Sequence, residues 1–245
     1  MKAVILGATK GMGRALARQA ASRGDTLFLL GRNAEDLERS AADCTAHNPA
    51  HEVGFAPCDL ADPDTFEPAL QAADEALGGF DTVIVTAGAF GTQEELEADP
   101  VRLRSLLTVN FAHTVLFCEA ARVRLMQRGG GTLCVFSSVA GDRGRKPVVL
   151  YGASKAGLSA YLEGLDHRYR DSGLVTLSVK PGFVRTGMTE GLRPPPFAGE
   201  PGQVATAVLA AIDRKAPMVY TPWIWRWVML VIRLLPRFVM RKVGF

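Results

Sequence analysis

The sequence predicts an α/β fold in which helices cover both faces of a doubly wound parallel sheet. Two observations support this prediction: short, wholly apolar segments alternate with longer amphipathic ones along most of the chain, and a glycine-rich turn follows the first apolar segment. Strands of a parallel sheet are buried on both faces and are therefore apolar throughout. At 245 residues, with 48% hydrophobic and 22% charged residues, the chain suits one large globular domain.

The expected elements alternate in type along the chain. Strands are expected at Lys2–Leu6, Thr26–Leu30, Glu52–Ala56, Thr82–Val85, Thr132–Phe136 and Val175–Val179. Helices are expected at Arg14–Arg23, Ala34–Ala46, Pro63–Leu77, Pro100–Arg128 as one long helix, and Gly152–Leu165. Right-handed crossovers between parallel strands place a ligand at the carboxyl ends of the strands. One domain over residues 1–221 is therefore predicted, followed by a distinct segment over residues 222–245.

The turn after the first strand has the composition of a phosphate-binding loop. It runs from Gly7 through Gly11 to Gly13 and leads directly into a helix. Glycines let the backbone approach a pyrophosphate, and the helix N-terminus offers free N–H groups and a positive dipole. The spacing G-x-x-x-G-x-G differs from the commoner G-x-G-x-x-G, and a simple tight turn is the alternative. Its place after the first strand favours a dinucleotide site and a Rossmann domain.

The end of the second strand indicates which dinucleotide is bound. An acidic residue there would bind the ribose hydroxyls of NAD. This chain has Arg32 instead, and Lys10 lies within the glycine turn. Two cations can converge on a 2′-phosphate, so NADPH is expected and NADH is disfavoured. Two solvated surface bases are the alternative interpretation.

A second motif, Ser138 followed by Tyr151 and Lys155, indicates acid–base chemistry. Tyr151 and Lys155 are four residues apart, which places them on one face of a helix. A nearby ammonium favours the phenolate, so we expect the pKa of Tyr151 to lie below its usual value near 10. Ser138 ends an apolar strand, where its hydroxyl could hold a substrate oxygen. An ordinary amphipathic helix with a surface tyrosine and lysine is the alternative.

These motifs, in this order, resemble the short-chain dehydrogenase/reductase family over residues 1–221. The matching segments are the glycine turn, the pair Asp59-Leu60 that holds adenine, Asn110 in the long helix, the Ser138, Tyr151 and Lys155 set, and the turn Pro181–Thr186. The resemblance implies that the catalytic residues are Asn110, Ser138, Tyr151 and Lys155. The cofactor contacts that it implies are Gly7, Thr9, Lys10, Gly11, Met12, Gly13, Arg32, Asp59, Leu60, Ala87, Gly88, Tyr151, Lys155, Pro181, Gly182, Val184 and Thr186.

The resemblance also implies a reaction and an assembly. Hydride would pass from NADPH to a ketone carbon while Tyr151 gives a proton to the developing alkoxide, Ser138 binds that oxygen and Lys155 holds the ribose. Asn110 would bind a water that links Lys155 to solvent. A homodimer or homotetramer is expected. Two departures, Leu6 in place of threonine and Thr86 in place of the asparagine of N-A-G, make the order of the local loops uncertain.

The charge distribution and the cysteines indicate the cellular compartment and the classes of partner to expect. The net charge is +3, but residues 214–245 carry seven lysines and arginines and no acid, so residues 1–213 carry 3 − 7 = −4. The four cysteines show no C-x-x-C pair, which predicts free, mostly buried thiols and a reducing compartment. The histidines lack metal-binding spacing. We expect a cytoplasmic protein with neither a metal nor a nucleic-acid partner.

The segment 222–245 is expected to be one basic amphipathic helix. All three tryptophans lie within Trp223–Trp227, and Arg226, Arg233, Arg237 and Arg241 are spaced along one helical face. Such a helix is typical of the membrane interface, here the inner face of the membrane. The alternative is that it packs on the substrate pocket or on another subunit, and a lid over the site would combine both roles.

The resemblance, taken together with the C-terminal segment, implies reduction of the ketone of an amphiphilic, lipid-linked keto sugar. A 3-keto acyl or 3-keto sphingoid lipid is the alternative substrate. A non-catalytic, NADPH-sensing membrane adaptor is the alternative from another class, although such an adaptor has no need of the complete catalytic set.

Overall fold

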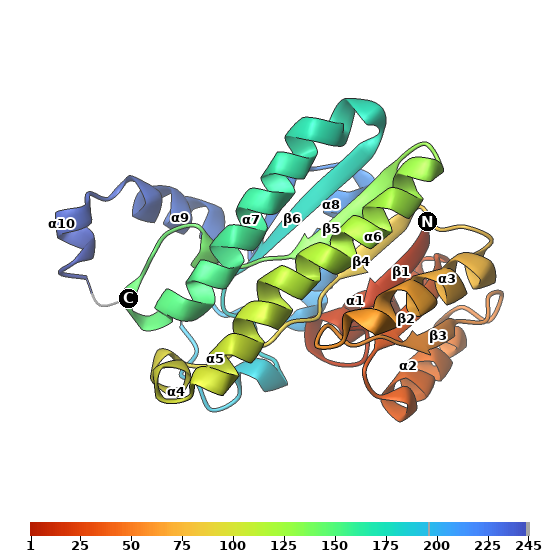
Figure 1. Ribbon diagram of the computed structural model, residues 1–245, viewed down its shortest axis with the longest axis horizontal. Coiled ribbons are helices and arrows are strands. Elements are labelled where there is room, and N and C mark those ends of the chain that lie inside the picture. The colour runs from red at the N-terminus through yellow and green to blue at the C-terminus, as the bar shows by residue number, and fades with distance from the viewer. Residues whose placement is uncertain (196, 244–245) are drawn as a thin grey trace.

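The computed structural model describes residues 1–195 and 197–243, which form one seven-stranded parallel sheet with helices on both faces (Figure 1). The strand order is β3-β2-β1-β4-β5-β6-β7. The strands are β1 (Lys2–Leu6), β2 (Thr26–Gly31), β3 (Gly54–Pro57), β4 (Thr82–Val85), β5 (Gly131–Phe136), β6 (Leu174–Pro181) and β7 (Met218–Thr221). The chain reverses direction across the sheet between β3 and β4, which leaves a crevice at the carboxyl ends of β1 and β4. The predicted fold class is confirmed.

The helices form two layers. They are α1 (Gly11–Ser22), α2 (Ala34–His47), α3 (Phe66–Leu77), α4 (Gln93–Ala98), α5 (Pro100–Leu107), α6 (Thr114–Gln127), α7 (Val149–Tyr169), α8 (Pro201–Asp213), α9 (Trp225–Leu234) and α10 (Arg237–Met240). Helices α1, α2 and α8 bury their apolar faces against one side of the sheet. Helices α3, α6 and α7 cover the other side.

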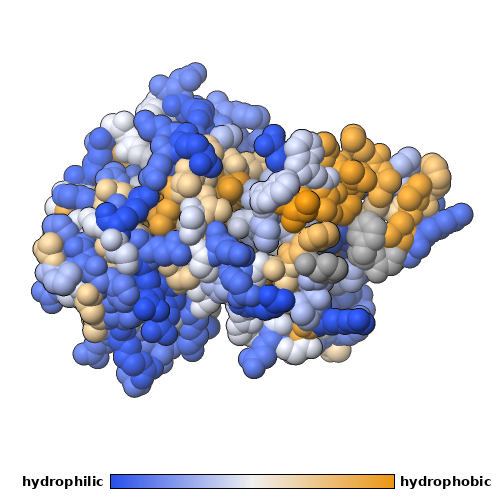
Figure 2. Space-filling view, turned by 180° about the vertical axis from the view of Figure 1, so that it is seen from behind, coloured by the Kyte–Doolittle hydropathy of each residue, from blue (hydrophilic) through white to orange (hydrophobic). Residues whose placement is uncertain are grey.

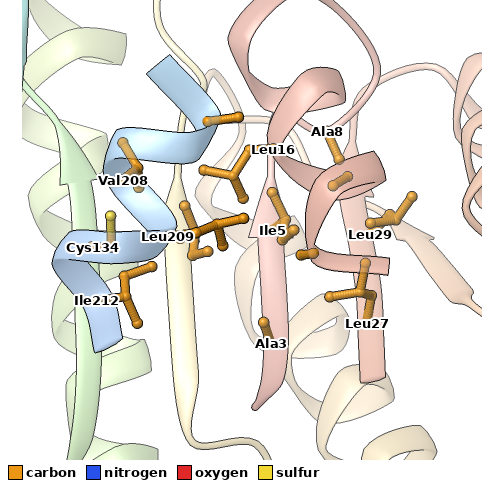
Figure 3. Close-up of a cluster of buried hydrophobic side chains, with 14 of the residues drawn as sticks. Ala3, Ile5, Ala8, Leu16, Leu27, Leu29, Cys134, Val208, Leu209 and Ile212 are labelled. Atoms are coloured by element: carbon orange, nitrogen blue, oxygen red, sulfur yellow. The ribbon is translucent and has the colours of Figure 1, made fainter. Parts of the chain in front are cut away.

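The core on the first side shows why β1 is apolar at every position. Ile5 is paired with Leu29 of β2 and with Ile84 of β4. Figure 3 shows Ile5 beside Leu16 of α1 and Leu209 of α8, with Leu27 and Leu29 of β2 on its other side. Burial of one such side chain contributes about 1.5–3 kcal/mol. The four cysteines are free and buried, as the sequence predicts.

The long helix expected from Pro100 to Arg128 is not continuous. A π-helical stretch, Thr108–His113, separates α5 from α6. The hydroxyl of Thr114, the first residue of α6, donates to the carbonyl of Val109 in this stretch at 2.7 Å. Such wide turns are frequent at functional sites, and this one contains Asn110. Two further helices, α4 and α8, and the edge strand β7 are additions to the expected elements, and the residues Pro63–Thr65 form a separate 3-10 turn before α3.

The C-terminal segment is also divided, which corrects the expectation of a single helix. Helix α9 ends at Leu234, and Leu235 adopts an extended backbone before Pro236 starts the short helix α10. Proline has no N–H group to continue the helical hydrogen bonds, so the break falls where the sequence places it. Arg233 and Arg237 consequently do not share one helical face. Residues 244–245 of the predicted segment lie outside the described residues. No helix in the described part of the chain has the length and apolar composition needed to cross a membrane.

Candidate active site

A cleft of about 560 Å³ opens at the carboxyl ends of β1, β2 and β4. Most of the predicted cofactor contacts line it, namely Gly7, Thr9, Lys10, Gly11, Met12, Gly13, Arg32, Asp59, Leu60, Ala87, Gly88 and Thr186. Ligand pockets in proteins commonly have volumes of roughly 300–1,000 Å³. The sheet topology therefore brings together residues from five separate loops around one space large enough for a nucleotide cofactor.

The glycine turn is built for close approach of backbone to backbone. Gly7 has φ of +92°, and a Cβ atom there would lie 2.6 Å from the amide nitrogen of Ala87. A Cβ atom at Gly13 would lie 2.1 Å from the carbonyl oxygen of Gly7. Only glycine fits at either position, and the N-terminus of α1 is left open to the cleft. This cradle fits the pyrophosphate of a dinucleotide.

Thr86, which stands in place of the asparagine of N-A-G, holds the neighbouring loops in position. Its hydroxyl lies 3.0 Å from the carbonyl oxygens of Leu6 and Gly7, so it ties the end of β4 to the glycine turn. The backbone nitrogens of Thr86 and Ala87 also donate to the carbonyl of Leu6. The two departures from the family pattern therefore leave this part of the cleft ordered.

The end of the cleft beside β2 carries the two predicted cations in different states. Lys10 pairs with Asp36 at 3.3 Å, although its side chain is 81% exposed. Asp36 also accepts from Arg39, and these two cations hold the pKa of its carboxyl below the usual value, Arg39 more strongly. Arg32 is exposed at the cleft and forms no ion pair among the described residues. Arg32 is thus the cation that is free to meet a phosphate.

Asp59 and Leu60 lie at the same end of the cleft. The Asp59 carboxylate accepts from the backbone nitrogen of Ala61 at 2.9 Å, which fixes the turn after β3. His113, at the end of the π-helix, donates through Nδ1 to the carbonyl of Leu60 at 2.7 Å. The π-helical stretch therefore contacts the predicted adenine end through His113.

Asn110 is fully buried and holds a loop of the cleft in place. Its Oδ1 accepts from the backbone nitrogen of Ala89 at 2.7 Å, and its Nδ2 donates to the carbonyl of the same residue at 2.8 Å. A Cβ atom on the adjacent Gly88 would lie 3.1 Å from Asn110 Oδ1 and 3.6 Å from Lys155 Nζ. Asn110 and Lys155 therefore meet at Gly88, on the wall of the cleft.

Ser138 lies at the end of β5, and close packing holds it against α7. Its hydroxyl accepts from the backbone nitrogen of Ala140 at 3.1 Å and lies 3.5 Å from the carbonyl of Pro181. The neighbouring Ser137 donates to the carbonyl of Lys155 at 3.0 Å. A Cβ atom at Gly141 would lie 2.6 Å from that carbonyl, so this glycine permits the contact between the turn and α7.

Tyr151 and Lys155 come together on the first turns of α7, as their spacing predicts. The Lys155 ammonium is buried, donates to the carbonyl of Phe136 at 3.0 Å and lies 5.9 Å from the centre of the Tyr151 ring. Burial lowers the pKa of Lys155 to about 8. Phe90, which lines the cleft, stacks edge-to-face on Tyr151 with ring centres 5.2 Å apart.

The expected lowering of the Tyr151 pKa is wrong for this structure. Burial raises the pKa of Tyr151 to about 12, while the hydroxyl of Ser138 acts in the opposite direction. The sequence shows the lysine four residues away but not the apolar packing that disfavours a phenolate. At neutral pH the phenol is therefore protonated, which is the form that a proton donor needs.

The turn after β6 is divided between the cleft and the protein interior. Thr186 lines the cleft, whereas Val184 is buried in the core with 3% exposure. The indole of Trp225 lies against Gly182, because a Cβ atom at that glycine would be 2.0 Å from Trp225 Nε1. Trp225 Nε1 is buried without a hydrogen-bond partner in the described structure. The predicted roles of Pro181, Gly182 and Val184 as cofactor contacts stay predictions.

The C-terminal segment packs beside the catalytic groups. Met229 and Ile232 of α9 are buried against Val139, the residue after Ser138. The opposite side of the segment is exposed and apolar, and its members are Trp223, Trp227, Leu230, Val231, Leu234 and Phe238. Figure 2 shows this apolar surface at one end of the molecule, away from the hydrophilic surface of the body. The helix therefore packs on the site and also presents an apolar face outward.

Sequence reasoning missed three residues that shape the site, namely Phe90, Trp225 and Asp142. The side chain of Asp142 is buried, pairs with Lys180 of β6 and accepts from the Tyr220 hydroxyl of β7 at 2.7 Å. It thereby anchors the loop between Ser138 and Tyr151 to the sheet edge. Two features of the sequence could have revealed two of these residues. Phe90 is an aromatic residue two places after Gly88, and Asp142 is the lone acid in a basic loop.

Comparisons with known proteins agree with this arrangement. The sequence model of a family described as short chain dehydrogenase matches residues 1–196. An uncharacterized oxidoreductase of Mycobacterium tuberculosis is 34% identical over 242 residues, covering 98% of this chain and 96% of the relative. An uncharacterized oxidoreductase of Streptomyces coelicolor is 35% identical over 250 residues, covering 98% of this chain and 94% of the relative. Because both alignments cover 98% of this chain, they include most of the C-terminal segment.

Two further proteins are similar over the body of the chain. Carbonyl reductase family member 4 of Danio rerio is 30% identical over 219 residues, covering 86% of this chain and 90% of the relative. The solved structure of levodione reductase superposes with a TM-score of 0.81 at 24% identity, covering 89% of this chain and 95% of that one. The structural likeness shows the same fold.

Proposed function

Because the chain belongs to the short-chain dehydrogenase/reductase family, we propose that it is an NADPH-dependent reductase acting on the ketone group of an amphiphilic substrate. Enzymes of this family are oxidoreductases that use NAD(P). The observation that carries the proposal is the meeting of Ser138, Tyr151 and Lys155 beside a nucleotide-sized cleft, with the partly exposed apolar helix α9 packed against Val139.

The residues of the chain divide the chemistry between them. A bound nicotinamide cofactor supplies the hydride. Tyr151 holds the proton that the product alcohol receives, and burial keeps that phenol protonated at neutral pH. Ser138 presents a hydroxyl to the ketone oxygen. Lys155 holds positive charge beside the tyrosine ring, and Asn110 fixes the loop at Ala89 that forms one wall of the cleft.

The preference for NADPH rests on Arg32. Its guanidinium is exposed at the cleft and is without a carboxylate among the described residues, whereas Lys10 is engaged by Asp36. A guanidinium forms strong, charge-assisted hydrogen bonds with phosphate. Arg32 would therefore bind the 2′-phosphate that distinguishes NADPH from NADH, with Lys10 as the weaker contributor.

The substrate class follows from the C-terminal segment. Three stretches, Ser137–Arg143, Tyr151–Leu165 and Val219–Arg237, resemble decaprenylphosphoryl-2-keto-ribose reductase. A lipid-linked keto sugar is accordingly the first substrate that we propose, and a 3-keto acyl or 3-keto sphingoid lipid is the second. The exposed apolar side of α9 would rest in the inner face of the membrane, where such substrates reside. A homodimer or homotetramer is the proposed assembly.

The proposal is tested by NADPH consumption with matched ketones. A long-chain 3-keto lipid and its short-chain, water-soluble analogue are supplied with and without anionic vesicles. We expect vesicles to raise turnover of the long-chain ketone and to leave that of the short one unchanged. Ser138→Ala serves as the control for site-dependent turnover. If neither ketone causes NADPH to be consumed, the proposal is refuted. It is also refuted if Ser138→Ala consumes NADPH as fast as the unmodified protein.

A further inference from the structure

A second cavity lies outside the cofactor cleft, between the loop that precedes α7 and the short helix α10. Its volume is about 540 Å³, and its lining includes five cations. These are Arg143, Arg145, Lys146, Arg237 and Arg241. The remaining lining residues are Gly144, Val149 and Met240, so no carboxylate faces the cavity from this lining. Such a concentration of like charge repels itself and attracts anions.

The cations of this cavity differ from the arginines of the body. Many arginines of the body meet carboxylates, for example Arg39 with Asp36 and Arg128 with Asp74. Within residues 1–195 and 197–243, none of the five cavity cations forms an ion pair. The Nε atom of Arg145 is buried and lacks a hydrogen-bond acceptor. An unpaired, desolvated guanidinium edge is costly and is relieved by an anionic acceptor.

The contacts that fix the walls of the cavity leave its cations without ion pairs among the described residues. Asp142, the carboxylate next to the loop, is already used by Lys180 and Tyr220. Arg143 donates to the carbonyl of Leu235 at 3.0 Å, which joins the loop to the break between α9 and α10. Pro236 redirects the chain at that break, and α10 then places Arg237 and Arg241, four residues apart, on the cavity.

The cavity also has two apolar lining residues. Val149 and Met240 line it, and Val149 is 51% exposed. Phe238 of α10 and Leu234 at the end of α9 are 66% and 77% exposed. A ligand that fits both features carries a compact anion and a hydrocarbon chain, and it places the chain on the apolar surface next to the anion.

We propose that this cavity is a binding site for the phosphate group of a membrane lipid, formed by Arg143, Arg145, Lys146, Arg237 and Arg241. Arginine matches phosphate oxygens with two parallel hydrogen bonds, and four of the five cations are arginines. A lipid phosphate held there would fix the protein in one orientation on the membrane. The loop that connects Ser138 to Tyr151 would then face the lipid.

The test is a calorimetric titration of the full chain with dihexanoyl phosphatidic acid, a water-soluble lipid phosphate, below its micellar concentration. Dihexanoylglycerol and inorganic phosphate are titrated separately. We expect the phosphatidic acid to bind about tenfold more tightly than either, because only it offers both anion and chain. The titration contains neither ketone nor nicotinamide, so its failure and the failure of the proposed reductase activity are separate results.

Matched double variants locate the binding. Arg145→Gln with Arg241→Gln should weaken phosphatidic acid binding about tenfold or more, since charge-assisted hydrogen bonds are lost. Arg226→Gln with Arg233→Gln removes the same charge from α9 outside the cavity and should leave the affinity nearly unchanged. If both double variants lose the same affinity for phosphatidic acid, binding is a general attraction between positive charge and phosphate, and the proposal is overturned.

Two more outcomes count against the lipid phosphate. If inorganic phosphate binds as tightly as phosphatidic acid, the hydrocarbon chains of the lipid do not contribute to binding. If the unmodified protein binds none of the probes, the cavity is not a phosphate site. Thermal unfolding guards against misfolded variants. Because the cavity variant relieves repulsion, its melting temperature should not fall, and Lys146→Gln, which changes an exposed cation, gives a second check with the same expected direction.

Discussion

The cofactor cleft and the C-terminal segment differ in how they treat charged and apolar side chains. Around the cleft two of the three cations are paired or enclosed: Lys10 meets Asp36, the Lys155 ammonium is buried against the carbonyl of Phe136, and Arg32 is exposed without an ion pair among the described residues. In the C-terminal segment the arginines of α10 face other cations, and Leu234 is 77% exposed. The cleft is ordered by the fold itself, whereas the C-terminal segment leaves apolar side chains exposed on its surface. Four experiments separate these two regions, in order of decreasing effect.

The largest effect is expected at Tyr151. Tyr151→Phe keeps the aromatic ring but removes the proton donor, so ketone reduction should fall about 10²–10⁴-fold while NADPH binding persists. Steady-state rates and NADPH fluorescence titration measure the two quantities. Tyr161→Phe is the control on the same helix, because the Tyr161 hydroxyl donates to Glu119 away from the cleft. A Tyr151→Phe protein with nearly full activity would show that another group is the acid.

The second effect concerns the cost of burying Lys155. Its pKa is about 8 in the folded protein, against an ordinary value of 10.5. Below pH 8 both the folded and the unfolded chain hold the proton, and the folded chain bears the full cost of the buried ammonium. Between pH 8 and 10.5 the folded chain gives up its proton first, so that cost disappears as the pH rises.

Lys155→Met should therefore be more stable than the unmodified protein at pH 7, by about 3 kcal/mol in the free energy of unfolding. The difference should shrink as the pH approaches 10.5. Urea unfolding of both proteins at pH 7 and at pH 10 measures it. A difference that does not change with pH would mean that Lys155 keeps an ordinary pKa in the folded chain.

The third effect is on cofactor choice. Arg32→Ala should weaken NADPH binding about tenfold or more and leave NADH binding almost unchanged, because one charge-assisted contact to phosphate is lost. Lys10→Ala should cost less, since Lys10 already pairs with Asp36. Fluorescence titration with both cofactors gives the four affinities. If the unmodified enzyme binds NADPH and NADH equally, Arg32 does not select the cofactor.

The smallest effect is expected on the apolar side of the C-terminal segment. Leu234→Ser should weaken binding to anionic vesicles about fivefold, since part of one leucine side chain no longer leaves water. Val101→Ser is the matched control because Val101, in α5, is 78% exposed but lies outside the segment. Vesicle co-sedimentation measures both, and high salt should weaken binding without abolishing it. Equal binding of Leu234→Ser and the unmodified chain would exclude the membrane role of this surface.

Deletion of residues 223–245 is a less specific experiment than the substitution. The deletion would also remove Met229 and Ile232 from Val139 and thus uncover the residue next to Ser138. We expect the deletion to release the protein from vesicles and to impair reduction of lipid ketones. Its effect on small ketones depends on how well the turn at Ser138 keeps its position without α9.

The parts of the structure that depend on local pattern could be predicted from the sequence. The apolar run of β1, the glycines beside it and the four-residue spacing of Tyr151 and Lys155 each determine a local geometry. The π-helical stretch could not be predicted, because Asn110 clasps the backbone of Ala89 from 21 residues away. The direction of the Tyr151 pKa likewise depends on Phe90 and the surrounding burial, which no local pattern reports.

The C-terminal segment shows the same limit in another form. Pro236 is visible in the sequence, but apolar and basic residues continue on both sides of it, so the pattern suggests one uninterrupted helix. The meeting of Arg143 and Arg145 with Arg237 and Arg241 follows from the turn at Pro236 and from the anchoring of the loop by Asp142. Neither distance along the chain nor composition indicates that contact.

Because of the π-helical stretch Thr108–His113, the structure of this region should be disturbed more by deletion of a residue than by substitutions. Removal of one residue would let α5 and α6 join as a regular α-helix, and each residue of such a helix turns the chain by about 100°. Asn110 would rotate away from Ala89, and His113 would leave the carbonyl of Leu60. A substitution within the stretch changes one contact at a time. A single deletion would rotate the following helix relative to α5 and break the contacts at Ala89 and at Leu60 together.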